Sequence, residues 1–291
     1  MKLVAKTFYA LENVLAKELE DLGAKDIQVG NRVVEYTGDK ELMYRSNLWL
    51  RTAISVLVPI EKFKFKDEQD FKRKLSNLSF NKYMQLNKTF AIKGAVNSKL
   101  FSHSHYPMLL LKDAIADYFN DKYGQRPSVE LKTPHVLFDL HIAENDCTIS
   151  LNSSGAPLFQ RGYRKSTGEA PLNEAVAAGL ILMSDWDQKS NFIDPFCGSG
   201  TIPIEAGLIA NGIPPQIARR KYSFMYWPDY DRNLWETVFK SAPAQPKRDL
   251  KFEIIGSDID QDVIQKARNN MKALPLGKTV SIVCRDFKDA D

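Results

Sequence analysis

The first third of the chain combines helical and strand patterns in short segments. Apolar residues recur at helical spacing over 10–23 and 39–53, and strand-like runs cover 3–9, 26–38 and 54–63. The run over 26–38 reads as a hairpin, and Asp39 is a typical first residue for the second helix. Helices interleaved with strands predict a small α+β unit over residues 1–64.

A second α+β unit is predicted over residues 65–160. Its helical patterns cover 67–78 and 106–124, and its strand-like runs cover 89–97 and parts of 128–154. The link that follows, GAPLFQRGYRKSTGEAP, contains turn-forming residues and cations. Nothing in it repeats at helical or at strand spacing. We therefore predict a domain boundary in this link, with the last domain covering 161–291.

From residue 172 the pattern changes to a regular alternation. Helical patterns cover 172–186, 200–212 and 261–274, and short apolar strands cover 191–196, 251–260 and 279–287. Short buried strands separated by helices are typical of a parallel sheet with right-handed crossovers. The expected fold class is thus α+β followed by α/β.

Composition changes this picture little. The chain has 291 residues, 44% of them hydrophobic, and a formal charge of +4, so a nucleic-acid surface would have to be a local patch. Three distant cysteines support neither a disulfide framework nor a zinc site, and His103 and His105 have no further ligand in register. No run approaches the ~20 apolar residues of a membrane span, and we expect a cytoplasmic protein without metal.

Acids follow each strand of the α/β part. Asp194, Asp258 and Asp286 end the first, second and third strand. In an open parallel sheet the ligand lies at the carboxyl ends of the strands, near the helix N-termini. We therefore expect these three carboxylates to share one ligand.

The loop after the first strand indicates the ligand. Gly198 and Gly200 let the backbone turn tightly, the N–H groups of the next helix favour an anion, and Asp194 favours a cation. An amino-acid arm carries both charges, while Asp258 is placed for a ribose and Asp286 for an adenine amine. A phosphate-binding P-loop lacks its lysine here, and Pro203 stands where a dinucleotide motif needs glycine. S-adenosylmethionine meets all of these demands.

Three motifs of the chain resemble those of a known family. The chain is similar to the THUMP-domain family of RNA guanine-N2 methyltransferases in the motifs DPFCGSGTIPIEA, GSDID and LFQRGYRKSTGEAPLNEAVAA. That family includes the bacterial 23S rRNA large-subunit enzymes, some of them labelled N6-adenine DNA methylases. The resemblance covers essentially the whole chain. It implies a ferredoxin-like subdomain over 1–64, a THUMP RNA-binding domain over 65–160, and a Rossmann-like methyltransferase domain over 161–291.

The resemblance also implies a set of cofactor-binding residues. The residues around the methionine portion are Asp194, Pro195, Phe196, Cys197, Gly198 and Gly200. The residues at the ribose and adenine are Asp258, Ile259, Asp286 and Phe287. Two further residues, Pro171 and Leu172, close the pocket. Cys197 has no histidine nearby in sequence, so we interpret it as a small loop residue and not as a nucleophile.

The family's catalytic tetrapeptide, of the form [DN]PP[YF], does not occur in the sequence; GIPPQIA follows a helix and lacks the acid or amide. We therefore expect a truncated domain with only its first three strands, one unpaired sheet edge, and catalytic residues beyond Asp291. The catalytic residues themselves are unknown.

The basic link supports two interpretations. Arg161, Tyr163, Arg164 and Lys165 are suited to follow an RNA backbone. Alternatively, Arg161 and Arg164 hold an interdomain hinge. The expected activity is S-adenosylmethionine-dependent methylation of a guanine N2 in 23S rRNA. The alternatives are an adenine-N6 DNA methylase and, for this chain, a non-catalytic RNA-binding module; the oligomeric state stays open.

Overall fold

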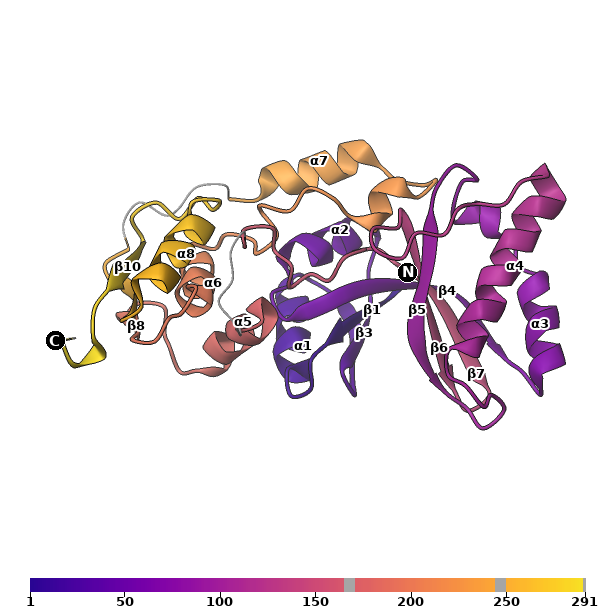
Figure 1. Cartoon of the computed structure of the whole chain (residues 1–291), viewed down its shortest axis with the longest axis horizontal. Coiled ribbons are helices and arrows are strands. Elements are labelled where there is room, and N and C mark those ends of the chain that lie inside the picture. The colour runs from indigo at the N-terminus through magenta and orange to yellow at the C-terminus, as the bar shows by residue number, and fades with distance from the viewer. Residues whose placement is uncertain (165–170, 244–249, 290–291) are drawn as a thin grey trace.

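The molecule is elongated, and the first part of the chain lies between the second and the third along the long axis (Figure 1). The computed structural model describes residues 1–164, 171–243 and 250–289. One end carries the small parallel sheet, and the opposite end carries α3 and α4.

The first two parts share a single seven-stranded sheet, with the order β2-β3-β1-β4-β7-β6-β5. Its elements are β1 (Lys2–Thr7), α1 (Glu12–Asp21), β2 (Lys25–Gly30), β3 (Val33–Thr37), α2 (Lys40–Trp49), β4 (Ala53–Lys64), α3 (Glu68–Ser76), η1 (Phe80–Lys82), β5 (Phe90–Asn97), α4 (Tyr106–Tyr123), β6 (Val136–Ala143) and β7 (Asp146–Asn152). The 12-residue β4 pairs with β1 through its first half and with β7 through its second. The two N-terminal units predicted from the sequence are therefore joined by one continuous ladder of backbone hydrogen bonds.

Local signals in the sequence explain where these helices begin and end. The carboxylates of Asp39 and Asp67 accept backbone N–H groups at the starts of α2 and α3. Gly124 ends α4 in the left-handed region, at φ 69°. α4 has 18 residues, yet no helix in the described ranges is both long and apolar enough to cross a bilayer.

The C-terminal part is the predicted α/β unit. It contains α5 (Glu174–Met183), β8 (Phe192–Asp194), α6 (Thr201–Ala210), β9 (Ile254–Asp258), α8 (Gln261–Met271), β10 (Val280–Cys284) and η3 (Phe287–Asp289). The strands are parallel, in the order β10-β9-β8, so β8 is an edge strand within the described residues. Every residue of α6 except Ile202 is buried, which explains why its sequence is apolar apart from Thr201 and Glu205.

The segment between α6 and β9 leaves this small sheet. Its elements η2 (Ser223–Tyr226) and α7 (Arg232–Ser241) pack on the N-terminal core beside α2. The Tyr44 ring lies 4.6 Å from that of Phe224 and 5.8 Å from that of Trp235, measured between centroids. This aromatic cluster joins the C-terminal part of the chain to the first domain.

Candidate functional site

The ends of the three parallel strands lie together, as the alternation of helices and strands predicts. In the register of the sheet, Asp194 of β8 faces Gly256, and Asp258 of β9 faces Cys284 of β10. The backbone N–H of Arg285 donates to the Asp258 carbonyl over 3.1 Å, which holds the segment leading to Asp286 against the end of β9. The three strand-end acids therefore belong to one edge of the sheet.

The glycine loop folds over the end of β9. The Cys197 N–H donates to the Ser257 carbonyl over 2.8 Å, and the Gly198 N–H donates to Asp258 Oδ2 over 3.1 Å. Gly198 and Gly200 have φ values of +53° and +86°, which side chains with a Cβ rarely adopt. A Cβ on Gly200 would also lie 3.0 Å from that of Ala267 on α8. Both glycines are thus required by backbone conformation, and Gly200 also by close packing.

Two carboxylates of this site are close enough to affect each other. Burial raises the pKa of Asp194 above its ordinary value, and the nearby carboxylate of Asp258 raises it further, against the lowering effect of the Phe196 N–H. That N–H donates to Asp194 Oδ1 over 3.1 Å. Because two nearby like charges repel, a cation placed between them would be bound favourably. The site thus suits a positively charged ligand group on the Asp194 side.

Cys197 lacks the properties of a nucleophile. Burial, with the charges of Asp194 and Asp258, raises the pKa of its thiol to about 12. A thiol with so high a pKa holds very little thiolate at neutral pH. The structure thus favours the role of a small buried loop residue, as the sequence indicates.

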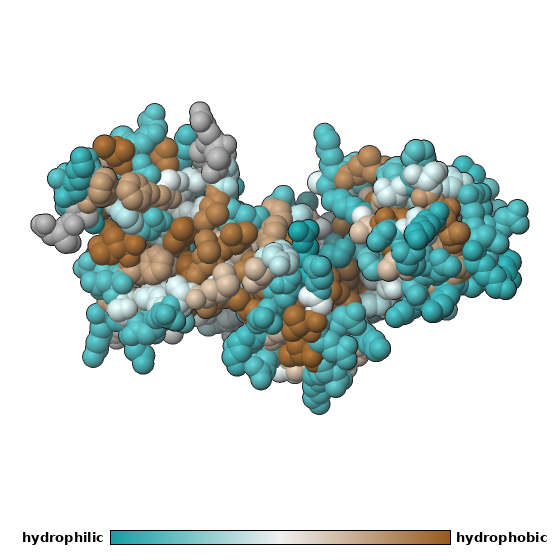
Figure 2. All heavy atoms as spheres, turned by 90° about the horizontal axis from the view of Figure 1, so that it is seen from below, coloured by the Kyte–Doolittle hydropathy of each residue, from teal (hydrophilic) through white to brown (hydrophobic). Residues whose placement is uncertain are grey.

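Exposed apolar side chains follow the strand-end acids in sequence. Phe196 is 68% exposed, Ile259 is 71% exposed and Phe287 is 50% exposed, and the rings of Phe196 and Phe287 lie 5.3 Å apart. Figure 2 shows apolar residues on the surface of the end of the molecule that carries the small parallel sheet. Exposed rings above paired acids form a surface on which a planar heterocycle can lie.

The remaining predicted cofactor residues lie at the margin of this group. The Leu172 carbonyl accepts Arg164 Nη2 over 2.8 Å, and the same nitrogen donates to Thr201 Oγ1, at the start of α6, over 2.7 Å. Pro171 precedes Leu172 and is exposed, and Asp286 uses Oδ1 to accept the Lys288 N–H. No described contact joins Asp286 directly to Asp194. Among the described residues, no cluster of three potential metal ligands occurs.

The predicted RNA contacts of the basic link need correction. Arg161 is fully buried and Tyr163 is 1% exposed, so neither side chain can reach RNA. Arg164 is occupied by an ion pair with Glu174, with Nε 3.2 Å from Oε1, and by its bonds to Leu172 and Thr201. Lys165 lies outside the described residues. The burial of Arg161 and the contacts of Arg164 support the interpretation as an interdomain hinge.

The hinge is a buried polar network that sequence reasoning missed in part. Arg161 Nε lies 3.3 Å from Glu205 Oε1, Nη1 donates to the Leu158 carbonyl and Nη2 to the Arg51 carbonyl. Arg51 in turn donates to the carbonyl of Leu208, in the last turn of α6, and to that of Ile213, which follows the helix. Glu205 is a lone acid in an otherwise apolar helix, and that isolation is the signal that would have indicated a buried partner.

Together these features define the class: an α/β domain with a glycine loop and acids at the carboxyl ends of its parallel strands, attached to a two-part N-terminal body. Three family profiles agree with it. Residues 2–57 match the RlmL ferredoxin-like domain, 65–152 the THUMP domain, and 161–291 the RMKL-like methyltransferase domain.

Curated relatives extend over nearly the whole chain. The protein named "Putative RNA methyltransferase slr0064" from Synechocystis sp. is 36% identical over 281 residues, which is 97% of this chain and 73% of that protein. The ribosomal RNA large subunit methyltransferase K/L of Buchnera aphidicola is 35% identical over 273 residues, 92% of this chain and 39% of that protein. The chain belongs to this THUMP-domain methyltransferase family, whose cofactor is S-adenosylmethionine.

Solved structures agree in fold. A predicted N6-adenine-specific DNA methylase from Listeria monocytogenes has a TM-score of 0.88 and 31% identity, covering 99% of this chain and 75% of that one. SMU.472, a putative methyltransferase solved with S-adenosylhomocysteine (SAH), has a TM-score of 0.85 and 29% identity, covering 99% and 76%. The Rossmann-like assignment of the C-terminal part is thus confirmed.

Proposed function

We propose that this chain binds S-adenosylmethionine at the β8–β10 edge and belongs to an enzyme that methylates a guanine N2 in large-subunit rRNA. The observation that carries the proposal is the meeting of Asp194, Gly198 and Asp258 at one strand edge. The name of the Buchnera relative supports the rRNA substrate. A ribosomal substrate also agrees with a cytoplasmic protein.

The residues fit the cofactor part by part. Asp194 binds the α-amine, and the N–H groups opening α6 bind the carboxylate, since no described side chain caps that helix. Asp258 accepts the ribose hydroxyls, Phe196 and Ile259 lie against the adenine, and Asp286 with Phe287 lies at its edge. Pro171 and Leu172 close the other side. S-adenosylmethionine itself supplies an activated methyl group.

Catalysis then depends mostly on alignment. A sulfonium methyl needs no strong base for transfer to an exocyclic amine if the two are held in line. The family tetrapeptide that would accept hydrogen bonds from that amine is not present in residues 1–291, so no catalytic residue is assigned here. The chain's own contribution is to bind and orient the donor.

A methyl-transfer assay tests this function. The protein as encoded by its gene is incubated with methyl-labelled S-adenosylmethionine and either large-subunit rRNA from a strain lacking that gene or duplex DNA. We expect label in RNA, recovered as N2-methylguanosine. Label in DNA as N6-methyladenine would establish the alternative that the Listeria name suggests. No calorimetric heat with S-adenosylmethionine would leave only the non-catalytic RNA-binding module.

The pH dependence of binding follows from Asp194. Burial raises the pKa of this carboxyl, and the cationic amine binds only the charged form. Affinity for S-adenosylmethionine should therefore fall as pH falls through the raised pKa. The apo protein should gain stability over the same range, because protonation removes a buried charge. Calorimetry and thermal melts of wild type and Asp194→Asn test both signs, since the variant should lose both dependences.

A further inference from the structure

A hollow lies between the THUMP strands and the segment after α6. Its volume is about 620 Å³.

 The hollow is lined from β5 and β6, from the loop over 132–135, from the loop over 154–157, and from residues 221–226. It is thus built by the second and third parts of the chain together.

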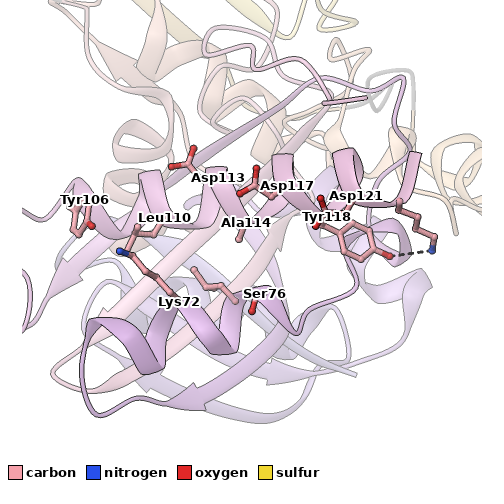
Figure 3. Close-up of a pocket in the computed structure, with 11 residues that line it drawn as sticks. Lys72, Ser76, Tyr106, Leu110, Asp113, Ala114, Asp117, Tyr118 and Asp121 are labelled. Atoms are coloured by element: carbon pink, nitrogen blue, oxygen red, sulfur yellow. Dashed lines mark hydrogen bonds between the residues drawn. The ribbon is translucent and has the colours of Figure 1, made fainter. Parts of the chain in front are cut away.

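The hollow is positively charged. Lys93, Lys132 and Lys221 line it, all three are exposed, and none of the described residues that line it is acidic. The larger groove between α3 and α4 differs: Asp113, Asp117 and Asp121 follow one another along α4 there, and Lys72 lines the groove from α3 (Figure 3). A polyanion would be repelled by those acids and attracted to the three lysines.

An aromatic ring stands among these cations. Tyr226 is half-buried, and its ring lies 4.5 Å from that of His135 in an edge-on contact. Lys88 Nζ lies 5.9 Å from the centroid of the Tyr226 ring. A fixed aromatic surface beside lysines is the combination that binds unpaired nucleotides, because bases stack on the ring while phosphates contact the cations.

The floor of the hollow is held in place by the protein itself. Arg219 donates from Nη2 to the carbonyls of Ser154 and Ala156 and from Nη1 to that of Pro157. Ser223 Oγ donates to the His135 carbonyl over 2.8 Å. A preformed site loses little conformational entropy when its ligand binds, so the hollow is ready to accept a chain.

We propose that this composite hollow binds a single-stranded stretch of the substrate RNA, with one unpaired base on Tyr226 and adjacent phosphates on Lys93, Lys132 and Lys221. The proposal rests on the proposed function for the identity of the nucleic acid. It places RNA contacts away from the buried Arg161 and Tyr163, on a surface shared by the THUMP strands and the segment after α6.

Charge reversal tests the phosphate contacts. Lys93→Glu, Lys132→Glu and Lys221→Glu are combined, and binding of a labelled single-stranded RNA decamer is measured by fluorescence anisotropy across a salt series. Three lost contacts should reduce the slope of log affinity against log salt by about 2, which corresponds to about 100-fold at 0.1 M salt. The matched control combines Lys25→Glu, Lys62→Glu and Lys189→Glu, which are exposed lysines elsewhere. An equal loss in both triple variants would overturn the proposal.

Tyr226 is tested separately. Tyr226→Ala should weaken RNA binding about 10-fold without changing the salt slope, because it removes stacking and no charge. Tyr226→Phe keeps the ring and should bind as the wild type does. Undiminished binding by Tyr226→Ala, or a loss seen only with duplex RNA, would contradict the proposal. Calorimetry with S-adenosylmethionine is the separate measurement. Unchanged heat in these variants shows that their cofactor site is intact. Absent heat in the wild type counts against the proposed function alone.

Discussion

Asp194→Asn is expected to weaken S-adenosylmethionine binding about 100-fold, measured by calorimetry at neutral pH. A hydrogen bond to a charged group contributes about 1.5–3 kcal/mol, and the upper part of that range corresponds to 100-fold. The asparagine keeps an oxygen for the Phe196 N–H and removes the repulsion with Asp258. The apo variant should therefore melt no lower than wild type, which separates lost binding from lost folding.

Ligand analogues test which part of the cofactor Asp194 binds. 5′-Methylthioadenosine lacks the amino-acid arm, so its affinity should not change in Asp194→Asn, whereas SAH keeps the amine and should lose as much as S-adenosylmethionine. Asp258→Asn should weaken all three ligands, because each carries the ribose. Asp185→Asn, an exposed acid of the same domain, is the matched control. A loss for methylthioadenosine in Asp194→Asn would show that Asp194 does not bind the arm.

The strand-edge site could be predicted from the sequence because the topology of a parallel sheet determines where the strand ends lie. Once short apolar strands alternate with helices, parallel pairing brings Asp194 and Asp258 to the same edge, whatever the details of packing. The glycines could be predicted for the same reason, since the turn into α6 needs positive φ. These conclusions depend on local pattern and on one general rule about parallel sheets.

Features that depend on long-range pairing could not be predicted. The pattern over 54–63 predicts a strand, but nothing in it indicates that β4 joins β1 to β7 in one sheet. Residues 223–241 pack against Tyr44 of α2, which is distant in sequence, and no pattern within that segment indicates this partner. Partner choice is a property of the whole chain, so single-segment patterns leave it open.

The basic link shows how a charged motif can mislead. RGYRK has the composition of an RNA-binding stretch, but Arg161 is bonded to two backbone carbonyls and to Glu205. A guanidinium carries five N–H donors in a planar fork and can satisfy several acceptors in an interior, whereas a lysine carries three donors on a single nitrogen. A basic residue in a turn-rich link is therefore ambiguous until its acceptors are known.

Arg161→Met is expected to destabilise the protein by about 3 to 5 kcal/mol, measured by denaturant unfolding. Removing one partner of a buried ion pair leaves the other charge uncompensated, and both Arg161 and Glu205 are fully buried. Glu205 would keep the Tyr163 hydroxyl on Oε1 and the nearby charge of Arg51, but it would lose its described ion pair, and Oε2 has no described hydrogen-bond partner. Lys240→Met, which breaks the exposed pair with Glu236, is the control and should change stability by less than about 1 kcal/mol.

The double variant Arg161→Met/Glu205→Leu distinguishes a lost charge partner from lost packing. Removing both charges should restore part of the stability, because no buried carboxylate remains. Recovery should be incomplete: the Leu158 carbonyl keeps the Gln216 amide at 2.7 Å, but the Arg51 carbonyl loses Arg161, and the Arg51 guanidinium loses the nearby charge of Glu205. A double variant no more stable than Arg161→Met would show that the arginine acts by filling space and not by charge.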